Sequence, residues 1–207
     1  MRAFLYTGGK VYPEAVTERP GAGDLVLAAD AGFLVAQRFG ITPQILLGDF
    51  DSLGEPHVPE GTELIRVPVE KDMTDTQLAV SHALSLGASE FVIVGGLDGR
   101  LDHTLSTLAV LEDLNIRKIP AVITSGKNRA RFLRNNSMII PRGSFRYLAI
   151  LAVDPVLRGV TLKGCKYPLR NARLSRTNQY AISNELTGNG ALIEIRRGGA
   201  FIIESTD

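Results

Sequence analysis

Four short acidic loops in the first half of the sequence hold the side chains that could do chemistry, and each loop adjoins an apolar run. Their carboxylates belong to Asp30, Asp49, Asp51, Asp72, Asp75 and Asp102. In an α/β sheet, the loops that leave the carboxyl ends of the strands converge on one crevice, so acids far apart in sequence become neighbours. Clustered carboxylates repel one another unless cations join them, and Mg²⁺ is held by one or two carboxylates together with substrate phosphates. The pattern predicts an enzyme that handles phosphate groups.

The segment Gly48-Asp49-Phe50-Asp51-Ser52 directly follows the apolar run 45–47. Both acids are therefore expected at the carboxyl end of a strand, on opposite sides of a tight turn, where they suit one or two Mg²⁺ ions. The alternative is structural, because Asp in loops commonly bonds its own backbone.

The segment Lys71-Asp72-Met73-Thr74-Asp75 precedes a helix predicted over 75–86, with Thr74 as its cap and Gly87 as its end. A helix start stabilises acids in its first turn, which gives Asp72 and Asp75 a structural role. The same positive end attracts phosphate, with Lys71 as a point-charge partner. Both roles stay open for these two acids.

The segment 95–103 contains three glycines directly after an apolar run, which let backbone come close to a ligand. Arg100 can clamp phosphate oxygens through its planar guanidinium. Asp102 could act in catalysis or cap the helix that follows. His103 could bond phosphate or have only a structural role at the start of that helix.

The elements that must position these loops differ between the two halves. In the first half, helices near 31–39, 75–86 and 103–114 separate apolar runs at 3–6, 25–28, 45–47, 64–67, 91–94 and 121–124. This alternation predicts βα units and a mostly parallel sheet in an α/β nucleotide domain over 1–126.

After Gly126 the sequence changes to short β-like runs without helices, which predict an antiparallel β-sandwich over 127–207. We expect strands at 130–133, 137–140, 145–152, 159–162, 179–182, 191–195 and 201–203. Gly198-Gly199 is expected to form a tight hairpin turn between the last two.

The net charge of +1 hides a division between the halves. Residues 1–126 hold nine Lys/Arg and seventeen Asp/Glu, a net charge of −8, whereas residues 127–207 hold fourteen and five, a net charge of +9. The basic residues are scattered among strand-like segments, so we expect no nucleic-acid partner. The two halves should instead attract each other, within a chain or across a dimer.

The apolar runs and the cysteine count indicate the cell compartment of the protein. No apolar stretch approaches the length of about eighteen residues that spans a bilayer, and the first residues are too weakly apolar for a secretory signal. The single Cys165 excludes an internal disulfide and a multi-cysteine zinc site. We expect a cytoplasmic protein without a membrane partner.

The chain resembles the thiamine pyrophosphokinase family in six motifs that occur in the family's order. Four are the loops around Asp30, Asp49, Asp75 and Asp102. The other two are Gly164-Cys165-Lys166-Tyr167-Pro168-Leu169 and Ile182-Ser183-Asn184-Glu185. The resemblance implies an α/β nucleotide domain, a C-terminal β-sandwich and a homodimer with its active site between subunits. It also implies transfer of the pyrophosphoryl group of ATP to thiamine, giving thiamine diphosphate and AMP.

The resemblance further implies roles for individual residues. Mg²⁺ would be carried by Asp49, Asp51 and Asp75. ATP would lie near Asp30, Lys71, Asp72, Arg100 and His103. Thiamine would contact Tyr167, Ser183 and Asn184 of the second subunit. The proton of the thiamine hydroxyl would pass to a carboxylate, either Asp75 or Asp102.

Two other functions fit parts of the pattern. A metal-dependent phosphohydrolase built on Asp49 and Asp51 would need no acceptor site, which leaves the second-half motifs without a role. A non-catalytic nucleotide-binding module would not need so many acids.

Overall fold

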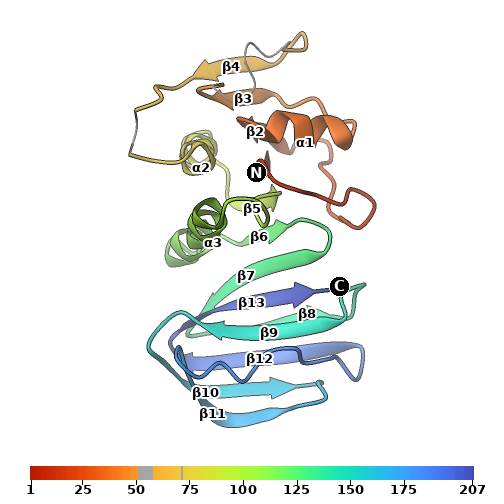
Figure 1. Cartoon of the computed structure of the whole chain (residues 1–207), viewed down its shortest axis with the longest axis vertical. Helices are drawn as coiled ribbons and strands as arrows, with labels where there is room; N and C mark the ends of the chain where they lie inside the picture. Colours follow the sequence, from red (N-terminus) through yellow and green to blue (C-terminus); the bar gives the residue numbers. More distant parts are fainter. Residues whose placement is uncertain (51–57, 71) are drawn as a thin grey trace. The chain divides into compact units, whose positions relative to one another are not determined.

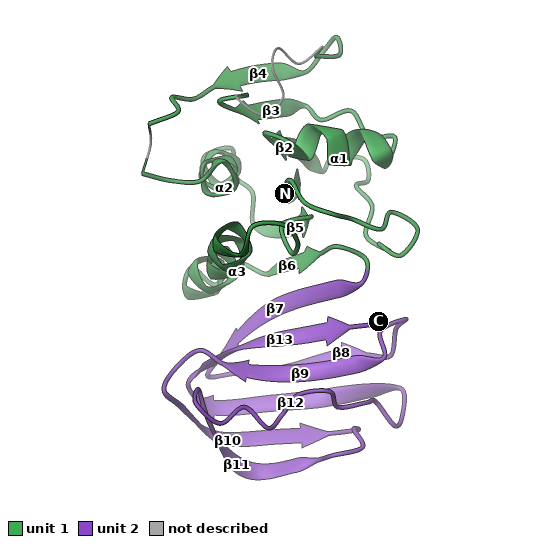
Figure 2. Cartoon of the chain, in the orientation of Figure 1, with its two compact units in different colours: residues 1–126 green, residues 127–207 purple. Residues whose placement is uncertain are grey.

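The computed structural model describes residues 1–50, 58–70 and 72–207. The chain divides into two units, Met1–Gly126 (unit 1) and Lys127–Asp207 (unit 2), which are traced in Figure 1 and coloured separately in Figure 2. The predicted site residues Asp51 and Lys71 lie outside the described residues.

Unit 1 contains a parallel sheet whose strand order is β4-β3-β2-β1-β5-β6. The strands are β1 (Arg2–Tyr6), β2 (Leu25–Ala29), β3 (Ile45–Gly48), β4 (Glu63–Arg66), β5 (Glu90–Val94) and β6 (Ala121–Thr124). Every residue of β2 and of β3 is buried, as expected for strands of a parallel sheet that is covered on both faces. The predicted α/β class of this half is confirmed.

Three helices cover the two faces of this sheet: α1 (Gly32–Arg38), α2 (Asp75–Ser85) and α3 (Leu101–Ile116). Helix α1 packs Phe33 and Ala36 into a core with Phe4, Tyr6 and Val26. Alternate strand residues such as Leu5 and Leu27 are also fully buried, on the opposite face. Helix α2 contacts β1, β2 and β3, while α3 contacts β6 and α2. No helix in the described residues is both long and apolar enough to span a membrane.

The strand order fixes where a ligand can enter unit 1. The chain adds β2, β3 and β4 on one side of β1 and then returns to place β5 on the other side. The direction of winding therefore reverses between β1 and β5. Ligands of open α/β sheets bind outside the carboxyl ends of the strands at this reversal.

Unit 2 contains two antiparallel sheets, as predicted. Its strands are β7 (Asn128–Arg134), β8 (Ser137–Pro141), β9 (Tyr147–Ala152), β10 (Val156–Lys163), β11 (Leu169–Ser175), β12 (Gly190–Arg197) and β13 (Gly199–Ser205). Within the unit, β7-β13-β9 form one set and β11-β10-β12-β8 form the other. Ile150 and Ile202 of the first set share a core with Leu157, Leu162 and Ile193 of the second. This shared core makes the unit a β-sandwich.

Two predicted details of unit 2 are wrong. Residues 179–182 form no named strand, because the side chain of Gln179 bonds both the N–H and the carbonyl of Ala152 in place of a backbone partner. Gly198 and Gly199 do not form a hairpin, since β12 and β13 pair in different sheets. Strand β11 was not predicted, because its apolar residues are interrupted by Arg170, Asn171 and Arg173.

Candidate functional site

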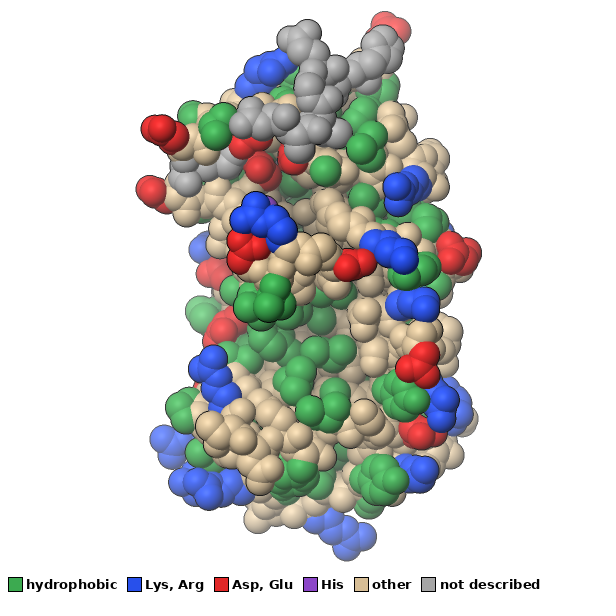
Figure 3. Space-filling view, in the orientation of Figure 1, with side chains coloured by type: hydrophobic (Ala, Val, Ile, Leu, Met, Phe, Trp, Pro, Cys, Tyr) green, Lys and Arg blue, Asp and Glu red, His purple; other side chains and the backbone are tan. Residues whose placement is uncertain are grey.

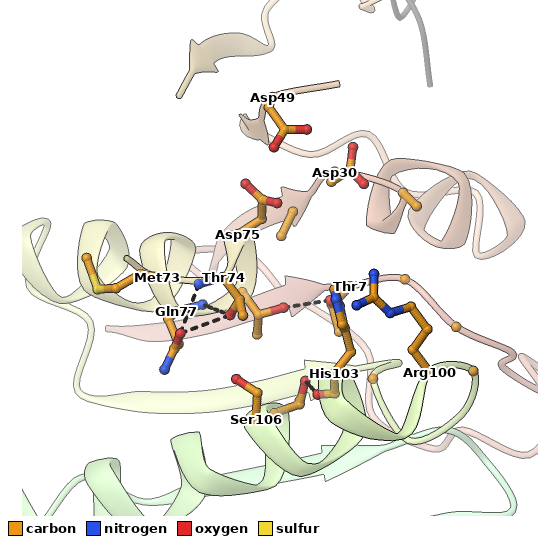
Figure 4. Close-up of a pocket in the computed structure, with 18 of the residues that line it drawn as sticks. Thr7, Asp30, Asp49, Met73, Thr74, Asp75, Gln77, Arg100, His103 and Ser106 are labelled. Atoms are coloured by element: carbon orange, nitrogen blue, oxygen red, sulfur yellow. Dashed lines mark hydrogen bonds between the residues drawn. The ribbon is translucent and has the colours of Figure 1, made fainter. Parts of the chain in front are cut away.

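A cavity of about 670 Å³ in unit 1 lies where the strand order reverses. It is lined by loops that follow β1, β2, β3 and β5 and by the first turns of α2 and α3, as Figure 4 shows. Of the predicted residues, the lining includes Asp30, Asp49, Asp72, Asp75, Arg100 and His103. The structure therefore brings together six predicted residues that are spread over more than seventy positions of the sequence.

Three carboxylates converge on one part of this cavity. Asp30, Asp49 and Asp75 come from three different segments and point into the same space in Figure 4. All three residues are half-buried, whereas Asp72 is exposed at the rim. Such a concentration of negative charge favours cations and ligands that carry cations with them.

Asp30 reaches the cavity because the loop after β2 turns sharply. Its backbone adopts φ +44°, a left-handed conformation that Asp tolerates better than most residues. The N–H of Asp30 donates to the carbonyl of Leu47 (2.8 Å), and its own carbonyl accepts from Phe33 in α1 (3.0 Å). The turn is thus held on both sides, by β3 and by the first turn of α1.

The first turn of α2 is fixed against β1. Thr74 caps the helix, because its hydroxyl accepts from the N–H of Gln77 while the Gln77 side chain accepts from the N–H of Thr74. The hydroxyls of Thr7 and Thr76 are buried and 2.8 Å apart, which joins the end of β1 to α2. The predicted cap is confirmed, and the positive end of α2 is held at the cavity together with Asp75.

Gly95 allows the loops after β1 and β5 to meet beneath the cavity. Its φ is +108°, and a Cβ atom there would lie 2.2 Å from the carbonyl oxygen of Thr7. Two backbone bonds tie the loops together, from Thr7 to Val94 (2.9 Å) and from Gly96 to Gly8 (2.8 Å). Gly95 is therefore used for packing of the two loops, whereas Gly96 and Gly99 line the cavity.

Arg100 and Asp102 form an exposed ion pair at the start of α3. Their nearest side-chain atoms, Nη2 and Oδ2, are 2.6 Å apart, and the side chains are 73% and 63% exposed. The hydrogen bond from Arg100 holds the pKa of Asp102 below its ordinary value, and the same bond raises the pKa of Arg100. Arg100 lines the cavity but Asp102 does not. Asp102 also accepts from the N–H of His103 (3.0 Å), which gives it a local role at the helix start.

The donor set at the cavity suits a hard cation. Its converging acidic side chains offer only carboxylate oxygens, the ligands that Mg²⁺ prefers. Across residues 1–50, 58–70 and 72–207, no three His, Cys, Asp or Glu side chains are grouped closely enough to form a metal site by themselves. Mg²⁺ needs only one or two protein carboxylates when phosphates and water complete its shell, so these residues fit that ion.

In unit 2, the three residues predicted to contact thiamine lie on the connections after β10 and β11. The Tyr167 residue is 60% exposed. Ser183 is also exposed and adopts φ +55°. Asn184 is only 3% exposed, and its side-chain amide bonds both the N–H and the carbonyl of Tyr167.

Several residues of the cavity wall were not predicted: Thr7, Gly8, Gly9, Gln77, Asp98 and Ser106. Thr7-Gly8-Gly9 carries a usable signal, because two glycines directly follow the apolar run of β1 at the end of a strand. Gln77 and Ser106 carry none, since polar residues on a helix are ordinary surface residues unless the packing of that helix is known.

Family models match both units. A model described as "Thiamin pyrophosphokinase, catalytic domain" matches residues 21–123, and one described as "Thiamin pyrophosphokinase, vitamin B1 binding domain" matches residues 137–198. The thiamine pyrophosphokinase of Bacillus subtilis is 29% identical over 195 residues, which are 88% of this chain and 88% of that protein. Thiamin pyrophosphokinase 1 of Caenorhabditis elegans is 26% identical over 171 residues, 78% of this chain and 70% of that protein.

Solved structures have the same architecture over the whole chain. The crystal structure of thiamine pyrophosphokinase from Bacillus subtilis superposes with a TM-score of 0.87 at 24% identity, covering all of both chains, which is a likeness of fold. A thiamin pyrophosphokinase family protein from Enterococcus faecalis gives a TM-score of 0.82 at 28% identity, again over all of both chains. Because the two family models together match well over half of the sequence, this chain belongs to the thiamine pyrophosphokinase family.

Proposed function

We infer that the protein transfers the pyrophosphoryl group of ATP to the hydroxyl oxygen of thiamine, giving thiamine diphosphate and AMP. The observation that carries this inference is the cavity at the strand-order reversal of unit 1, in which three carboxylates, Arg100 and the first turns of two helices converge. Membership of the thiamine pyrophosphokinase family supplies the identity of the two substrates. The protein is an ATP-dependent diphosphotransferase.

The side chains of the cavity bind and orient the phosphates. Displacement at phosphorus asks the protein mainly for positioning and for neutralisation of charge. Arg100 offers a planar cation to phosphate oxygens, and the first turns of α2 and α3 offer backbone N–H groups and their positive ends. We propose that Asp49 and Asp75 hold Mg²⁺, with Asp51 as a further ligand. When bound, the ion neutralises phosphate charge and fixes the orientation of the phosphates.

Asp75 suits the role of proton acceptor better than Asp102. Asp75 lines the cavity at the first residue of α2, within the group of converging carboxylates. Asp102 is paired with Arg100 outside the lining, and its lowered pKa makes it a weaker base. We therefore propose that the carboxylate oxygen of Asp75 that is not bound to Mg²⁺ accepts the proton of the thiamine hydroxyl.

We propose that Tyr167 and Ser183 contact thiamine and that the functional form is a homodimer whose sites use residues of both subunits. The opposite net charges of the two halves support the dimer, because an acidic half of one chain would attract the basic half of another. On the face drawn in Figure 3, acidic side chains lie mainly over unit 1 and basic side chains surround unit 2.

Mixing two impaired variants at a low thiamine concentration tests the shared site. An Asp49→Asn chain mixed with an Asn184→Ala chain should recover part of the activity. One of the two sites in a mixed dimer would then combine the intact Asp49 of one chain with the intact Asn184 of the other. A monomer that is fully active in solution would exclude the shared site.

We also propose a cytoplasmic location. The sequence holds one cysteine, Cys165, so no internal disulfide calls for an oxidising compartment. Cys165 is buried, and burial raises the pKa of its thiol, which keeps the thiol protonated and unreactive.

Incubation of the protein with ATP and Mg²⁺, with and without thiamine, tests the function. We expect thiamine diphosphate only in the complete mixture and little breakdown of ATP without thiamine. Release of phosphate or pyrophosphate from ATP without thiamine would favour the phosphohydrolase instead. Binding of ATP without any turnover would favour a nucleotide-binding module.

A further inference from the structure

Asn184 joins two segments of unit 2 through separate groups. Its backbone pairs with β9, where the N–H of Asn184 donates to the carbonyl of Leu148 (3.0 Å) and its carbonyl accepts from Leu148 (2.8 Å). Its side chain reaches the connection that carries Tyr167. There Oδ1 accepts from the N–H of Tyr167 (3.0 Å) and Nδ2 donates to the carbonyl of Tyr167 (2.7 Å). The amide thus takes the place of a peptide group in an antiparallel pairing.

The hydrogen-bonding capacity of this amide is nearly used up. Oδ1 also accepts from the N–H of Glu185 (3.0 Å), so both of its lone pairs have donors. Nδ2 keeps one N–H beyond its bond to Tyr167, and the residue is only 3% exposed. A side chain buried to this degree, with three bonds to backbone, has little left to offer a ligand.

Tyr167, in contrast, is placed for contact. The residue is 60% exposed although its backbone is held at both N–H and carbonyl by Asn184. An aromatic side chain on a fixed backbone offers a large contact surface at little cost in conformational entropy. The Lys166 ammonium lies over one face of the ring, 5.6 Å from its centroid, and the aromatic parts of thiamine suit the other face.

We propose that Asn184 is a positioning residue for thiamine, which fixes the backbone of Tyr167 so that the exposed ring meets the vitamin. This proposal rests on the proposed function and replaces a direct contact between Asn184 and thiamine. Loss of the amide loosens the connection at Tyr167 and leaves the two neighbouring backbone bonds in place, from Lys166 to Glu185 and from Thr187 to Gly164 (both 2.9 Å).

Gln179 provides a matched control in the same unit. Its side-chain amide also replaces a backbone partner, since Oε1 accepts from the N–H of Ala152 (3.0 Å) and Nε2 donates to its carbonyl (3.1 Å). These bonds hold the end of β9 and do not involve Tyr167. Gln179→Ala therefore removes the same kind of contact without releasing the aromatic residue.

A double-mutant cycle on thiamine KM tests the proposal. We expect Tyr167→Ala to raise the thiamine KM about tenfold, as loss of an aromatic anchor does. Asn184→Ala should raise it by a similar or smaller factor, and the double variant should be no worse than Tyr167→Ala alone. The ATP KM should stay unchanged in all three. Multiplied effects in the double variant would mean that Asn184 acts on thiamine independently of Tyr167, which would overturn the proposal.

Two further variants separate the proposed role of Asn184 from a general loss of stability in unit 2. Asn184→Asp keeps the acceptor for Tyr167 and Glu185 but loses the donor to the Tyr167 carbonyl, so its thiamine KM should also rise; a wild-type KM would contradict the proposal. Gln179→Ala should keep the wild-type thiamine KM, and a rise equal to that of Asn184→Ala would show a general effect of loosening unit 2. If the wild-type chain makes no thiamine diphosphate, the proposed function itself fails, an outcome distinct from multiplied effects in an active enzyme.

Discussion

In unit 1 the candidate site residues follow the ends of strands, whereas in unit 2 they lie on connections held by side-chain amides. The parallel sheet of unit 1 brings six predicted residues to one cavity simply by its strand order. The sandwich of unit 2 has no such focal edge, and Asn184 fixes Tyr167 through hydrogen bonds instead. In unit 1 the strand order therefore positions the candidate site residues. In unit 2 the position of Tyr167 depends on the buried side-chain amide of Asn184.

The largest effect should come from the carboxylates of unit 1. Asp49→Asn and Asp75→Asn each remove a negative charge with little change in shape, so we expect each to lower kcat by at least about tenfold while the fold is kept. A chelator should abolish activity in the wild type. Steady-state rates and circular dichroism measure the two parts of this prediction.

Glu194→Gln is the matched control in unit 2, because Glu194 forms a partly exposed ion pair with Arg196 and does not line the cavity. It should keep the wild-type rate. Near-wild-type rates for both Asp variants would contradict the proposal that Asp49 and Asp75 hold Mg²⁺. They would also contradict the claim that the catalytic residues lie in unit 1.

A smaller effect should appear in the stability of unit 1 when Gly95 is replaced. Gly95→Ala combines a left-handed φ of +108° with a Cβ placed 2.2 Å from the carbonyl oxygen of Thr7, so the free energy of unfolding should fall by about 2 kcal/mol or more. Gly188→Ala in unit 2 meets no atom within 4 Å and should change it by less than about 0.5 kcal/mol. Urea unfolding compares the two variants. Equal midpoints would show that the contact between the loops after β1 and β5 contributes little to the free energy of unfolding.

Asp102→Asn should lower kcat much less than Asp75→Asn. The carboxylate of Asp102 lies outside the cavity lining and pairs with Arg100. Its lowered pKa means that this pair is lost at a lower pH than an ordinary carboxyl group would require. An equal loss of kcat in both variants would make Asp102 a candidate for the proton acceptor again.

The smallest effect at neutral pH concerns Tyr6, which lies in the apolar core of unit 1. Tyr6 is fully buried, and its hydroxyl has no hydrogen-bond partner among the described residues. Burial raises the pKa of Tyr6 to about 12. The unfolded chain therefore loses this proton near pH 10 while the folded chain keeps it, and stability falls by roughly 3 kcal/mol as pH rises from about 10 to 12.

Tyr6→Phe should lack this alkaline loss and keep its stability at neutral pH within about 1 kcal/mol. Unfolding in urea at pH 8 and at pH 10.5 provides the comparison. The same alkaline loss in both proteins would assign it to other groups.

Sequence patterns predict unit 1 well because its signals are local. Apolar runs of three or four residues mark its strands, and Thr74 marks the start of α2. Once the strands are taken as parallel, their carboxyl ends must share an edge, which is why Asp30, Asp49 and Asp75 were expected together. Gln77 and Ser106 were missed because their place in the cavity wall depends on how helices pack against the sheet.

Unit 2 is harder to predict because its backbone partners are partly side chains. Gln179 bonds Ala152 where a strand was expected, and the buried amide of Asn184 bonds the backbone of Tyr167. Either amide looks like an ordinary polar loop residue in the sequence. The step from β12 to β13 was also misjudged, since two glycines can turn a hairpin or pass the chain to another sheet.

Phosphorus NMR of the reaction mixture tests the central claim most directly, because it identifies which bond of ATP is broken. Attack at the β-phosphorus transfers two phosphates as one unit, so AMP and thiamine diphosphate should appear in equal amounts and only when thiamine is present. A simple kinase would instead give ADP with thiamine monophosphate. ADP formed in step with thiamine consumption, or AMP released without thiamine, would contradict pyrophosphoryl transfer by the cavity of unit 1.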